Sequence, residues 1–331
     1  MFKNLFHSKI PSIPSISMPS MPKIKIDKPT LFLYIVTLVF LIVFVYNRTY
    51  TPKIQEGMSL ADMTFTEKYK TNQSIDNIYN KFYVSIYDQL FMEGNRLKFE
   101  VDRTASYTKM DKKSVVLDIG SGTGHHLRAF HQIAGETTGV EMSREMAKKS
   151  QENYPYIKIN YGNALNNLMY PEGSFTHITM YYYTIYYFKD KYGILTNVYK
   201  WLRPGGYFVV HLVNRKMFDP VVGLSNPFVF VNPQKYAKKR ITRSKIYFND
   251  VEYSSIYDLD DKADTATFDE ILKHKHTQNI VQNTHTVHMP SLKRIVKQAE
   301  NIGFKVNKVL HMSPIQYEYN YLYIFQKPKQ R

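Results

Sequence analysis

Short apolar runs alternate with stretches of helical periodicity in the centre of the chain. Val115–Leu117 is a β-branched run that suits a strand buried on both faces of a sheet. Further strands are predicted at 137–140, 157–161, 175–180 and 207–213, and helices at 125–134 and 191–202. Pro204, Gly205 and Gly206 predict a turn before the strand at 207–213. The centre of the chain is therefore predicted to be an α/β domain.

The pattern changes on either side of this centre. An apolar stripe from Ser74 to about Leu90, with residues at helical spacing, predicts a packing helix. Residues 215–289 contain four strand-like segments, 241–248, 251–258, 265–273 and 279–288, separated by polar turns. They predict an inserted antiparallel β meander above the carboxyl edge of the sheet, where it would form the substrate wall. A helix at 292–302, ended by Gly303, and strands at 304–312 and 319–326 complete the domain.

The segment at 30–46 differs in kind from the rest. Thirteen of the sixteen residues from Leu31 to Tyr46 are Leu, Ile, Val or Phe, and none is charged. Seventeen residues make about 25 Å of helix, the short end of what crosses a bilayer. A buried core helix and a cleaved signal peptide are less favoured, since Pro29 and Pro52 bracket the run and no small-residue cleavage site follows it. We expect a single-pass transmembrane helix.

The flanks of this segment suggest a tether and a stalk. Residues 1–29 form a Pro/Ser-rich flexible tail, and residues 47–73 a polar stalk before a domain at 74–328. Five lysines precede the apolar run, which favours a cytosolic N-terminus. If the domain uses a cosubstrate that is made in the cytosol, the domain itself should lie in the cytosol, which requires the opposite orientation of the helix. We expect a membrane location, with the side of the domain left open.

A glycine-rich turn follows the strand at Val115–Leu117. Asp118 ends the strand, and Gly120, Gly122 and Gly124 follow at every second position. Glycines so close together allow a tight turn and let a ligand approach the backbone. The order of strand, loop and helix also points backbone N–H groups at a ligand. A glycine-rich turn without a ligand is the alternative.

The spacing of the glycines limits the classes of ligand that the loop could bind. A dinucleotide fingerprint needs glycine at position 125, which is His125, and a phosphate-binding P-loop needs a Gly-Lys-Ser/Thr ending that is absent. Glu141 ends the next predicted strand, where a carboxylate can accept hydrogen bonds from both hydroxyls of a ribose. The motif therefore favours a nucleoside without a phosphate-binding loop.

Six segments follow the order and spacing of one family. They read V-L-D-I-G-S-G-T-G (116–124), G-V-E-M-S (139–143), G-N-A (162–164), S-F-T-H-I-T-M (174–180), I-Y-Y-F-K-D (185–190) and W-L-R-P-G-G-Y-F-V-V (201–210). The chain resembles a class I, type 11-like S-adenosylmethionine-dependent methyltransferase. The resemblance implies a Rossmann-like seven-stranded sheet with helices on both faces, and S-adenosylmethionine as the methyl donor.

The resemblance also implies which residues hold the donor. They are Asp118, Gly120, Ser121, Gly122, Gly124, Glu141, Met142, Asn163, Ala164 and Tyr181. Asn163 would bind the adenine amino group through its side-chain carbonyl, and Tyr181 would present its ring to the sulfonium cation. Thr176 stands where the family often has an acidic residue, which removes one possible anchor.

A general base is needed only if the methyl acceptor arrives protonated. His211, near the end of the fifth strand, is the candidate catalytic residue, with His125 and His126 as alternatives. His274, His276, His285 and His288 alternate as strand residues do, without carboxylates at set spacing, so no metal site is predicted. The absence of cysteine excludes disulfides, thiolate metal sites and a cysteine nucleophile.

The net charge of the chain does not identify the methyl acceptor. The formal net charge is +16, from 44 basic and 28 acidic residues, which favours anionic partners. A basic run comprises Lys235, Lys238, Lys239, Arg240, Arg243 and Lys245. A membrane-anchored methyltransferase for a small or lipid-like acceptor is the first hypothesis. An RNA methyltransferase and a non-catalytic, membrane-tethered binding module are the alternatives. The residues after the fourth strand, Met180–Tyr183, lack the Asn/Asp-Pro-Pro-aromatic motif that methylation of base amino groups uses.

Overall fold

The computed structural model describes residues 27–49, 64–92, 94–218, 243–248 and 250–329. The chain divides into two units, Met1–Tyr50 and Thr51–Arg331. In the first unit, α1 (Lys28–Thr49) is one helix of 22 residues. Within the residues that the structure describes, no helix qualifies by length and apolar character as a bilayer span. The predicted transmembrane helix at 30–46 therefore stays a prediction.

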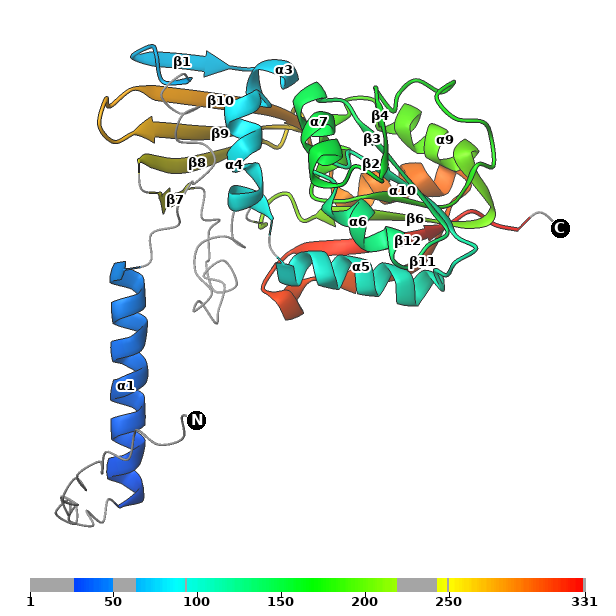
Figure 1. Cartoon of the computed structure of the whole chain (residues 1–331). Coiled ribbons are helices and arrows are strands. Elements are labelled where there is room, and N and C mark those ends of the chain that lie inside the picture. Colours follow the sequence, from blue (N-terminus) through cyan, green and yellow to red (C-terminus); the bar gives the residue numbers. More distant parts are fainter. Residues whose placement is uncertain (1–26, 50–63, 93, 219–242, 249, 330–331) are drawn as a thin grey trace, which may run out of the picture. The chain divides into compact units, whose positions relative to one another are not determined.

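The second unit is built on a seven-stranded sheet (Figure 1). Its strands are β2 (Val115–Ile119), β3 (Glu136–Glu141), β4 (Lys158–Tyr161), β5 (Phe175–Met180), β6 (Leu202–Val213), β11 (Lys305–His311) and β12 (Asn320–Gln326). They lie in the order β11-β12-β6-β5-β2-β3-β4. The five strands from β6 to β4 are parallel, while β12 runs antiparallel to β6 and to β11. The predicted Rossmann-like sheet is confirmed.

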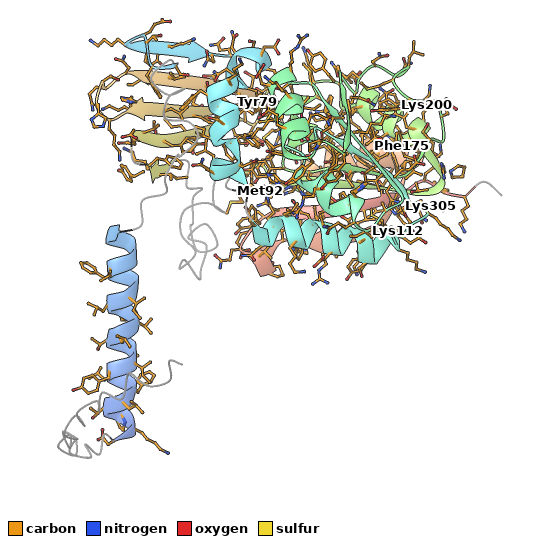
Figure 2. All side chains as sticks on the ribbon, in the orientation of Figure 1. Tyr79, Met92, Lys112, Phe175, Lys200 and Lys305 are labelled. Atoms are coloured by element: carbon orange, nitrogen blue, oxygen red, sulfur yellow. The ribbon has the colours of Figure 1, made fainter. Side chains whose placement is uncertain are left out.

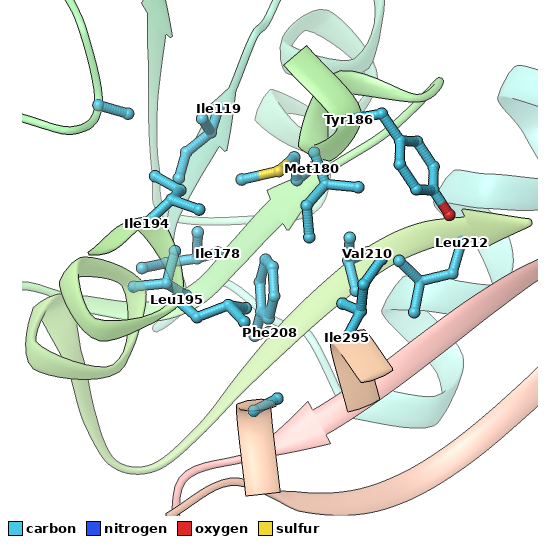
Figure 3. Packing of buried hydrophobic residues seen from close by; sticks show 14 of the residues in the cluster. Ile119, Ile178, Met180, Tyr186, Ile194, Leu195, Phe208, Val210, Leu212 and Ile295 are labelled. Carbon is cyan, nitrogen blue, oxygen red and sulfur yellow. The ribbon is translucent and has the colours of Figure 1, made fainter. Parts of the chain in front are cut away.

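Helices cover both faces of this sheet. They are α5 (Gly94–Thr108), α6 (His125–His131), α7 (Arg144–Asn153), α8 (Thr184–Tyr187), α9 (Lys191–Trp201) and α10 (Leu292–Ile302), followed by a short 3-10 turn, η3 (Ser313–Ile315). Side chains alternate across a strand, so Phe208 and Val210 of β6 pack with α9 and α10, whereas Val209 packs with α5 and α6. Figure 3 shows the first of these cores, in which Phe208 lies among Ile178, Leu195 and Ile295.

A second sheet of five strands stands beside the first (Figure 1). It contains β1 (Tyr69–Asn72), β7 (Arg243–Tyr247), β8 (Val251–Asp260), β9 (Thr265–His274) and β10 (Ile280–His288), in the order β1-β10-β9-β8-β7. Strands β7 to β10 form the predicted antiparallel meander. The structure differs from the prediction at β1, which lies in the expected polar stalk and pairs in parallel with β10. Asn72 is buried there and donates to the Asn283 side chain at 2.9 Å.

The apolar stripe after Ser74 forms two helices instead of one, α3 (Ile75–Ile78) and α4 (Lys81–Phe91). Asn80 separates them because its side chain accepts a hydrogen bond from the Tyr83 N–H and so caps α4. The inner face of α4, with Phe82 and Ile86, packs on Leu272 and its neighbours in the second sheet. These helices therefore belong to the wall formed by the meander.

Helix α5 was not predicted by the apolar pattern, because the side chains on its buried stripe are largely polar. Arg96, Glu100, Thr104 and Thr108 are all buried. Arg96 donates to the carbonyl of Phe91 at 2.7 Å, and Glu100 lies 4.0 Å from the Arg96 guanidinium and 2.7 Å from the His126 imidazole. Polar residues therefore occupy much of the buried face beside Val101, and contacts with other parts of the fold must satisfy them.

The buried ring of Phe208 provides a test of the first core. We expect Phe208→Ala to lower the free energy of unfolding by about 3–5 kcal/mol, because it removes a ring from a close-packed cluster and leaves a cavity. Tyr192→Ala, at a site 57% exposed, should change it by less than about 0.5 kcal/mol. Urea denaturation of the full chain, followed by the fluorescence of its one tryptophan, measures both. Equal losses in the two variants would contradict this packing.

Candidate active site

A cavity of ≈ 400 Å³ lies where the carboxyl ends of β2 to β5 meet the second sheet. Such a position, outside the carboxyl ends of parallel strands, is where open α/β sheets bind ligands. The loops of the first sheet line one part of this cavity. Their lining residues are Gly120, Gly122, Glu141, Met142, Asn163 and Ala164. All six were predicted to bind the donor from the sequence.

The glycine loop shapes this part of the cavity through its lack of side chains. Gly122 has φ +54°, and a Cβ atom there would meet no atom within 4 Å, so its missing side chain leaves open space. The sequence predicted backbone N–H groups that point at a ligand, but several N–H groups of this loop are bonded within the fold. Gly120 and Ser121 donate to the carbonyl of Val140, and Gly124 to that of Ser121. Such a loop offers few donors to a phosphate, which agrees with the absence of a P-loop motif.

Glu141 fixes the loop against the next strand. Its Oε2 accepts the N–H of Gly122 at 2.9 Å, and its Oε1 accepts the N–H of Ser143 at 2.8 Å. Burial raises the pKa of Glu141, while these backbone N–H groups lower it. Each carboxylate oxygen keeps a second lone pair. Glu141 can therefore hold the loop and accept two ribose hydroxyls at once.

Aromatic side chains form the opposite wall of the cavity. They come from α3 and α4, from the turn after β5 and from the second sheet, and include Tyr79, Tyr83, Tyr87, Tyr182, Tyr183 and Phe268. Tyr182 (φ +40°) and Tyr183 (φ +65°) adopt the left-handed region, which costs bulky residues free energy. The guanidinium of Arg96 lies 3.8 Å from the centre of the Tyr182 ring and supports it from behind.

The second sheet also places a carboxylate and an imidazole at the cavity. His285 lines the cavity, and its Nε2 lies 2.7 Å from Oε2 of the fully buried Glu270. The Tyr187 hydroxyl lies 2.9 Å from Nδ1 of His285. Sequence reasoning considered His285 only as a metal ligand and did not single out Glu270 or Tyr187. The alternation of Glu270 and His285 on neighbouring strands was the available signal, but it did not reveal that the two side chains meet.

Four of the predicted donor-binding residues lie away from the cavity lining. Asp118 is buried and accepts a hydrogen bond from Thr179 at 2.7 Å. Ser121 faces Gly139, and Gly124 lies against Ser150, where a Cβ would approach to 2.2 Å. Tyr181 points to the other face of the sheet. Its hydroxyl forms a hydrogen bond of 2.6 Å with the hydroxyl of Thr104, and its ring stacks on His126. The structure gives these four packing roles, and their contact with the donor stays a prediction.

Asn163 lines the cavity, but its side-chain oxygen already accepts the N–H of Leu165 at 2.9 Å. A carbonyl oxygen has a second lone pair, so Asn163 can still accept a hydrogen bond from an adenine amino group. Thr176 stands where the family often has an acidic residue. Its hydroxyl accepts a hydrogen bond from the N–H of Val115 at 2.8 Å. Thr176 therefore joins two strands and does not reach the cavity.

His211 is fully buried and is not part of the cavity wall. Its Nε2 lies 3.0 Å from Oδ1 of Asn320, and its Nδ1 lies 3.8 Å from Glu100. Side chains alternate along β6, which directs His211 to the α5 face while Val210 and Leu212 point to the other. Burial lowers the pKa of His211 to about 4, although the nearby Glu100 raises it. The structure therefore does not bring the predicted catalytic base to the substrate side.

The alternative histidines are also engaged elsewhere. His125 lies 2.9 Å from Asp88 and 2.7 Å from the Tyr154 hydroxyl, and His126 lies 2.7 Å from Glu100. Neither is a lining residue of the cavity. Across the part of the chain that the structure describes, no group of three or more acidic or histidine side chains is arranged to hold a metal ion. Of the basic run, Lys235 to Arg240 lie outside the described residues, and Lys245 pairs with Glu252.

Comparison with known proteins decides the class of the domain. Residues 117–210 match the family described as a methyltransferase domain. These residues form a methyltransferase domain. They carry the glycine loop, Glu141 and the strands β3 to β5, so the matched region and the loop side of the cavity coincide.

Relatives extend this result. The chain is 28% identical over 145 residues to a demethylmenaquinone methyltransferase of Bacillus licheniformis, covering 41% of this chain and 61% of that protein. The match therefore spans less than two thirds of the relative's length. An S-adenosylmethionine-dependent methyltransferase of Clostridium acetobutylicum has the same fold, with 15% identity, a TM-score of 0.57 and coverage of 76% of this chain and all of that one.

A second solved structure is S-adenosylmethionine-bound CalS10, an amino pentose methyltransferase from Micromonospora echinaspora. It is 14% identical with a TM-score of 0.53, and the match covers 77% of this chain and all of that one. At these identities the two structures show the fold alone. The family match and the curated relative agree with the predicted methyltransferase domain, and a solved structure that binds S-adenosylmethionine shares its fold.

The depressed pKa of His211 has a measurable effect on stability. Between about pH 4 and the unfolded value of 6.5, only the unfolded chain binds this proton. The stabilisation from neutral His211 is thus complete above pH 6.5 and is lost as the pH falls toward 4. We expect the difference in unfolding free energy between wild type and His211→Gln to shrink over this window. Urea denaturation at several pH values measures the difference.

Asp118 acts in the opposite direction, because burial raises its pKa to about 6 and its contribution declines as the pH rises. It is present in both proteins, so its contribution cancels from the difference to first order. His276→Gln, whose side chain is 77% exposed, is the control and should leave the pH dependence unchanged. A constant difference between wild type and His211→Gln from pH 7 to 4 would show that folding leaves the pKa of His211 unchanged, which would contradict this account.

Proposed function

We propose that this protein transfers a methyl group from S-adenosylmethionine to a small acceptor that binds against the aromatic wall of the cavity. One observation carries the proposal: the same cavity is lined by Gly122 and Glu141 on one side and by tyrosines of the second sheet region on the other. A donor and an acceptor that share one closed space are held close to each other. Proximity of this kind can contribute about 7–11 kcal/mol to the reaction.

The residues on the loop side fit the donor. The open space at Gly122 leaves room beside the backbone, and Glu141 retains lone pairs for two hydroxyls. Met142 and Asn163 flank the place expected for the nucleoside base. S-adenosylmethionine, when bound, supplies an electrophilic methyl group on a sulfonium. The electron-rich faces of Tyr182 and Tyr183 suit such a cation, and the tyrosine wall keeps water from it.

The acceptor side favours a small, largely apolar molecule. Its lining consists mainly of aromatic and aliphatic side chains, several of them with hydroxyl groups, and the acidic and basic residue types among the lining residues are Glu141, Lys189 and His285. The relatives named above act on a demethylmenaquinone and on an amino pentose, and both are small acceptors. A cavity of ≈ 400 Å³ accords with a molecule of that size more than with folded RNA.

Donor binding tests this proposal directly. Calorimetry on the full chain should detect S-adenosylmethionine binding that weakens at least tenfold in Glu141→Ala. Two hydrogen bonds to a charged group are lost, each worth about 1.5–3 kcal/mol, and about 1.4 kcal/mol corresponds to tenfold. Gly122→Arg should abolish binding by filling the open space beside the loop.

The matched control is Glu136→Ala, which removes the exposed carboxylate at the opposite end of the same strand. It should bind the donor as wild type does. If wild type shows no affinity for S-adenosylmethionine, or if Glu136→Ala and Glu141→Ala lose affinity equally, the assignment of the donor site is wrong. Binding without methyl transfer to any acceptor would favour the binding module instead.

Attachment to a membrane through residues 30–46 is a separate part of the proposal. The support is the sequence of this segment, which has no charged residue between Leu31 and Tyr46. An acceptor dissolved in the bilayer would then be within reach of a tethered domain.

An arginine in the middle of the segment tests the attachment. Each arginine at the centre of a membrane helix costs about 2.5–3.5 kcal/mol, so Leu38→Arg combined with Leu41→Arg should release the chain from the membrane fraction after an alkaline wash. Tyr192→Arg, at an exposed site in α9, should leave the distribution unchanged. Recovery of the wild-type chain in the soluble fraction would refute the anchor.

A further inference from the structure

Paired strands of the second sheet bring Glu270 and His285 together at the cavity. Glu270 of β9 pairs in register with Asn283 of β10, so His285, two residues on, is its diagonal neighbour on the same face. Tyr83 of α4 and Tyr253 of β8 also direct their hydroxyls to this carboxylate, at 2.5 and 2.7 Å. Three separate elements thus supply donors to one buried carboxylate.

These contacts fit the arrangement of hydrogens that a proton relay requires. Because Glu270 accepts from two tyrosine hydroxyls and from the imidazole, it is an ionised carboxylate, which acts only as an acceptor. His285 must then carry its hydrogen on Nε2 and donate it to Glu270. In this tautomer Nδ1 holds a lone pair and accepts the hydroxyl hydrogen of Tyr187, 2.9 Å away. The carboxylate also stabilises the imidazolium that forms if Nδ1 gains a proton.

Tyr187 connects this pair to the space in which an acceptor would lie. Its side chain is half-buried and lines the cavity. With its hydrogen on His285, its oxygen presents lone pairs to a hydroxyl that enters the cavity; the hydroxyl of Tyr79, labelled in Figure 2, lies 3.4 Å from it. Burial raises the pKa of Tyr187 well above its usual value, so Tyr187 stays neutral and passes a proton on without keeping a negative charge.

We propose that Tyr187, His285 and Glu270 form a proton relay that deprotonates a phenol-like or enol-like hydroxyl of the methyl acceptor. The inference rests on the proposed function, because the relay acts on a molecule in the same cavity. Tyr187 contacts the acceptor, His285 receives the proton, and Glu270 is the positioning residue that holds the imidazole in the required tautomer. None of these roles follows from the glycine loop or from the family match.

The proton and electron balance is complete within the cavity. The acceptor O–H gives its proton to the oxygen of Tyr187, which gives its own proton to Nδ1 of His285. The electron pair of the former O–H bond then forms the new bond to the transferred methyl carbon, and the electron pair of the former carbon–sulfur bond stays on the sulfur of the departing cosubstrate. Imidazolium loses the extra proton to water after the product leaves.

The wall around the relay indicates the class of acceptor. Aromatic rings surround Tyr187 and His285: Tyr79 lies 5.9 Å from the imidazole, and Phe268 lies 5.7 Å from it. Rings at these distances favour a flat, apolar partner. An amine acceptor that enters as a cation would be held best by a carboxylate, but the oxygens of Glu270 are occupied by three donors. A planar molecule with a weakly acidic hydroxyl suits the site better.

The phenol 4-nitrophenol tests the relay without knowledge of the natural acceptor, because its anion absorbs at a longer wavelength than its neutral form. At a pH low enough that the free probe is neutral, binding to the full chain should produce the absorbance of the anion. His285→Gln should reduce the ionised fraction of bound probe at least tenfold. Tyr187→Phe, which removes one oxygen and keeps the ring, should do the same, and Glu270→Gln should reduce it to a smaller extent.

His288→Gln is the matched control, because His288 lies on the same strand and does not line the cavity. It should ionise the probe as wild type does. Calorimetry with S-adenosylmethionine, run on each variant, shows that the fold and donor site are intact. If wild type binds the donor but leaves 4-nitrophenol neutral or unbound, or if Tyr187→Phe ionises it normally, the relay is refuted. If donor binding itself fails, the proposed function fails instead.

Discussion

The carboxylate of Glu141 is the interaction on which the site depends. It joins the glycine loop after β2 to the start of α7 through the N–H groups of Gly122 and Ser143. Without it, a loop of glycines would have many conformations of similar energy. Held in this way, the loop keeps its open side toward the cavity. Holding the loop does not prevent Glu141 from binding a ligand, because each carboxylate oxygen keeps a second lone pair.

Two of the buried carboxylates, Glu100 and Glu270, lie at the centre of separate polar clusters. Glu100 binds His126 behind the sheet, near Arg96 and His211, and its pKa is lowered by these partners although burial raises it. Glu270 instead binds tyrosines and His285 at the cavity wall. In both clusters the buried carboxylate accepts hydrogen bonds from neighbouring side chains, which offsets part of the cost of its burial. Only the Glu270 cluster adjoins the space where a substrate can bind. We therefore assign a catalytic role to the Glu270 cluster and a structural role to the Glu100 cluster.

The second sheet gives the domain its particular wall. A methyltransferase fold supplies the loop side of the cavity, while β8 to β10, together with α3 and α4, share the aromatic side with the segments that follow β5 and β6. Fold alone does not determine which acceptor is used, because function resides in the side chains grafted on it. The acceptor class is therefore read from the tyrosines, Phe268 and His285, and not from the seven-stranded sheet.

The sequence by itself determined the parts that depend on local pattern. Apolar runs located β2, β5 and the meander, and the glycine spacing with Glu141 located the donor side, because periodicity and turn chemistry act over a few residues. Tertiary structure alone decided three other features: the folding of α5 with a polar inner stripe, the burial of His211, and the pairing of Glu270 with His285. These depend on which face of a strand meets which helix, and on contacts between residues 15 or more apart in the chain. Local pattern carries no record of such contacts, so packing had to reveal them.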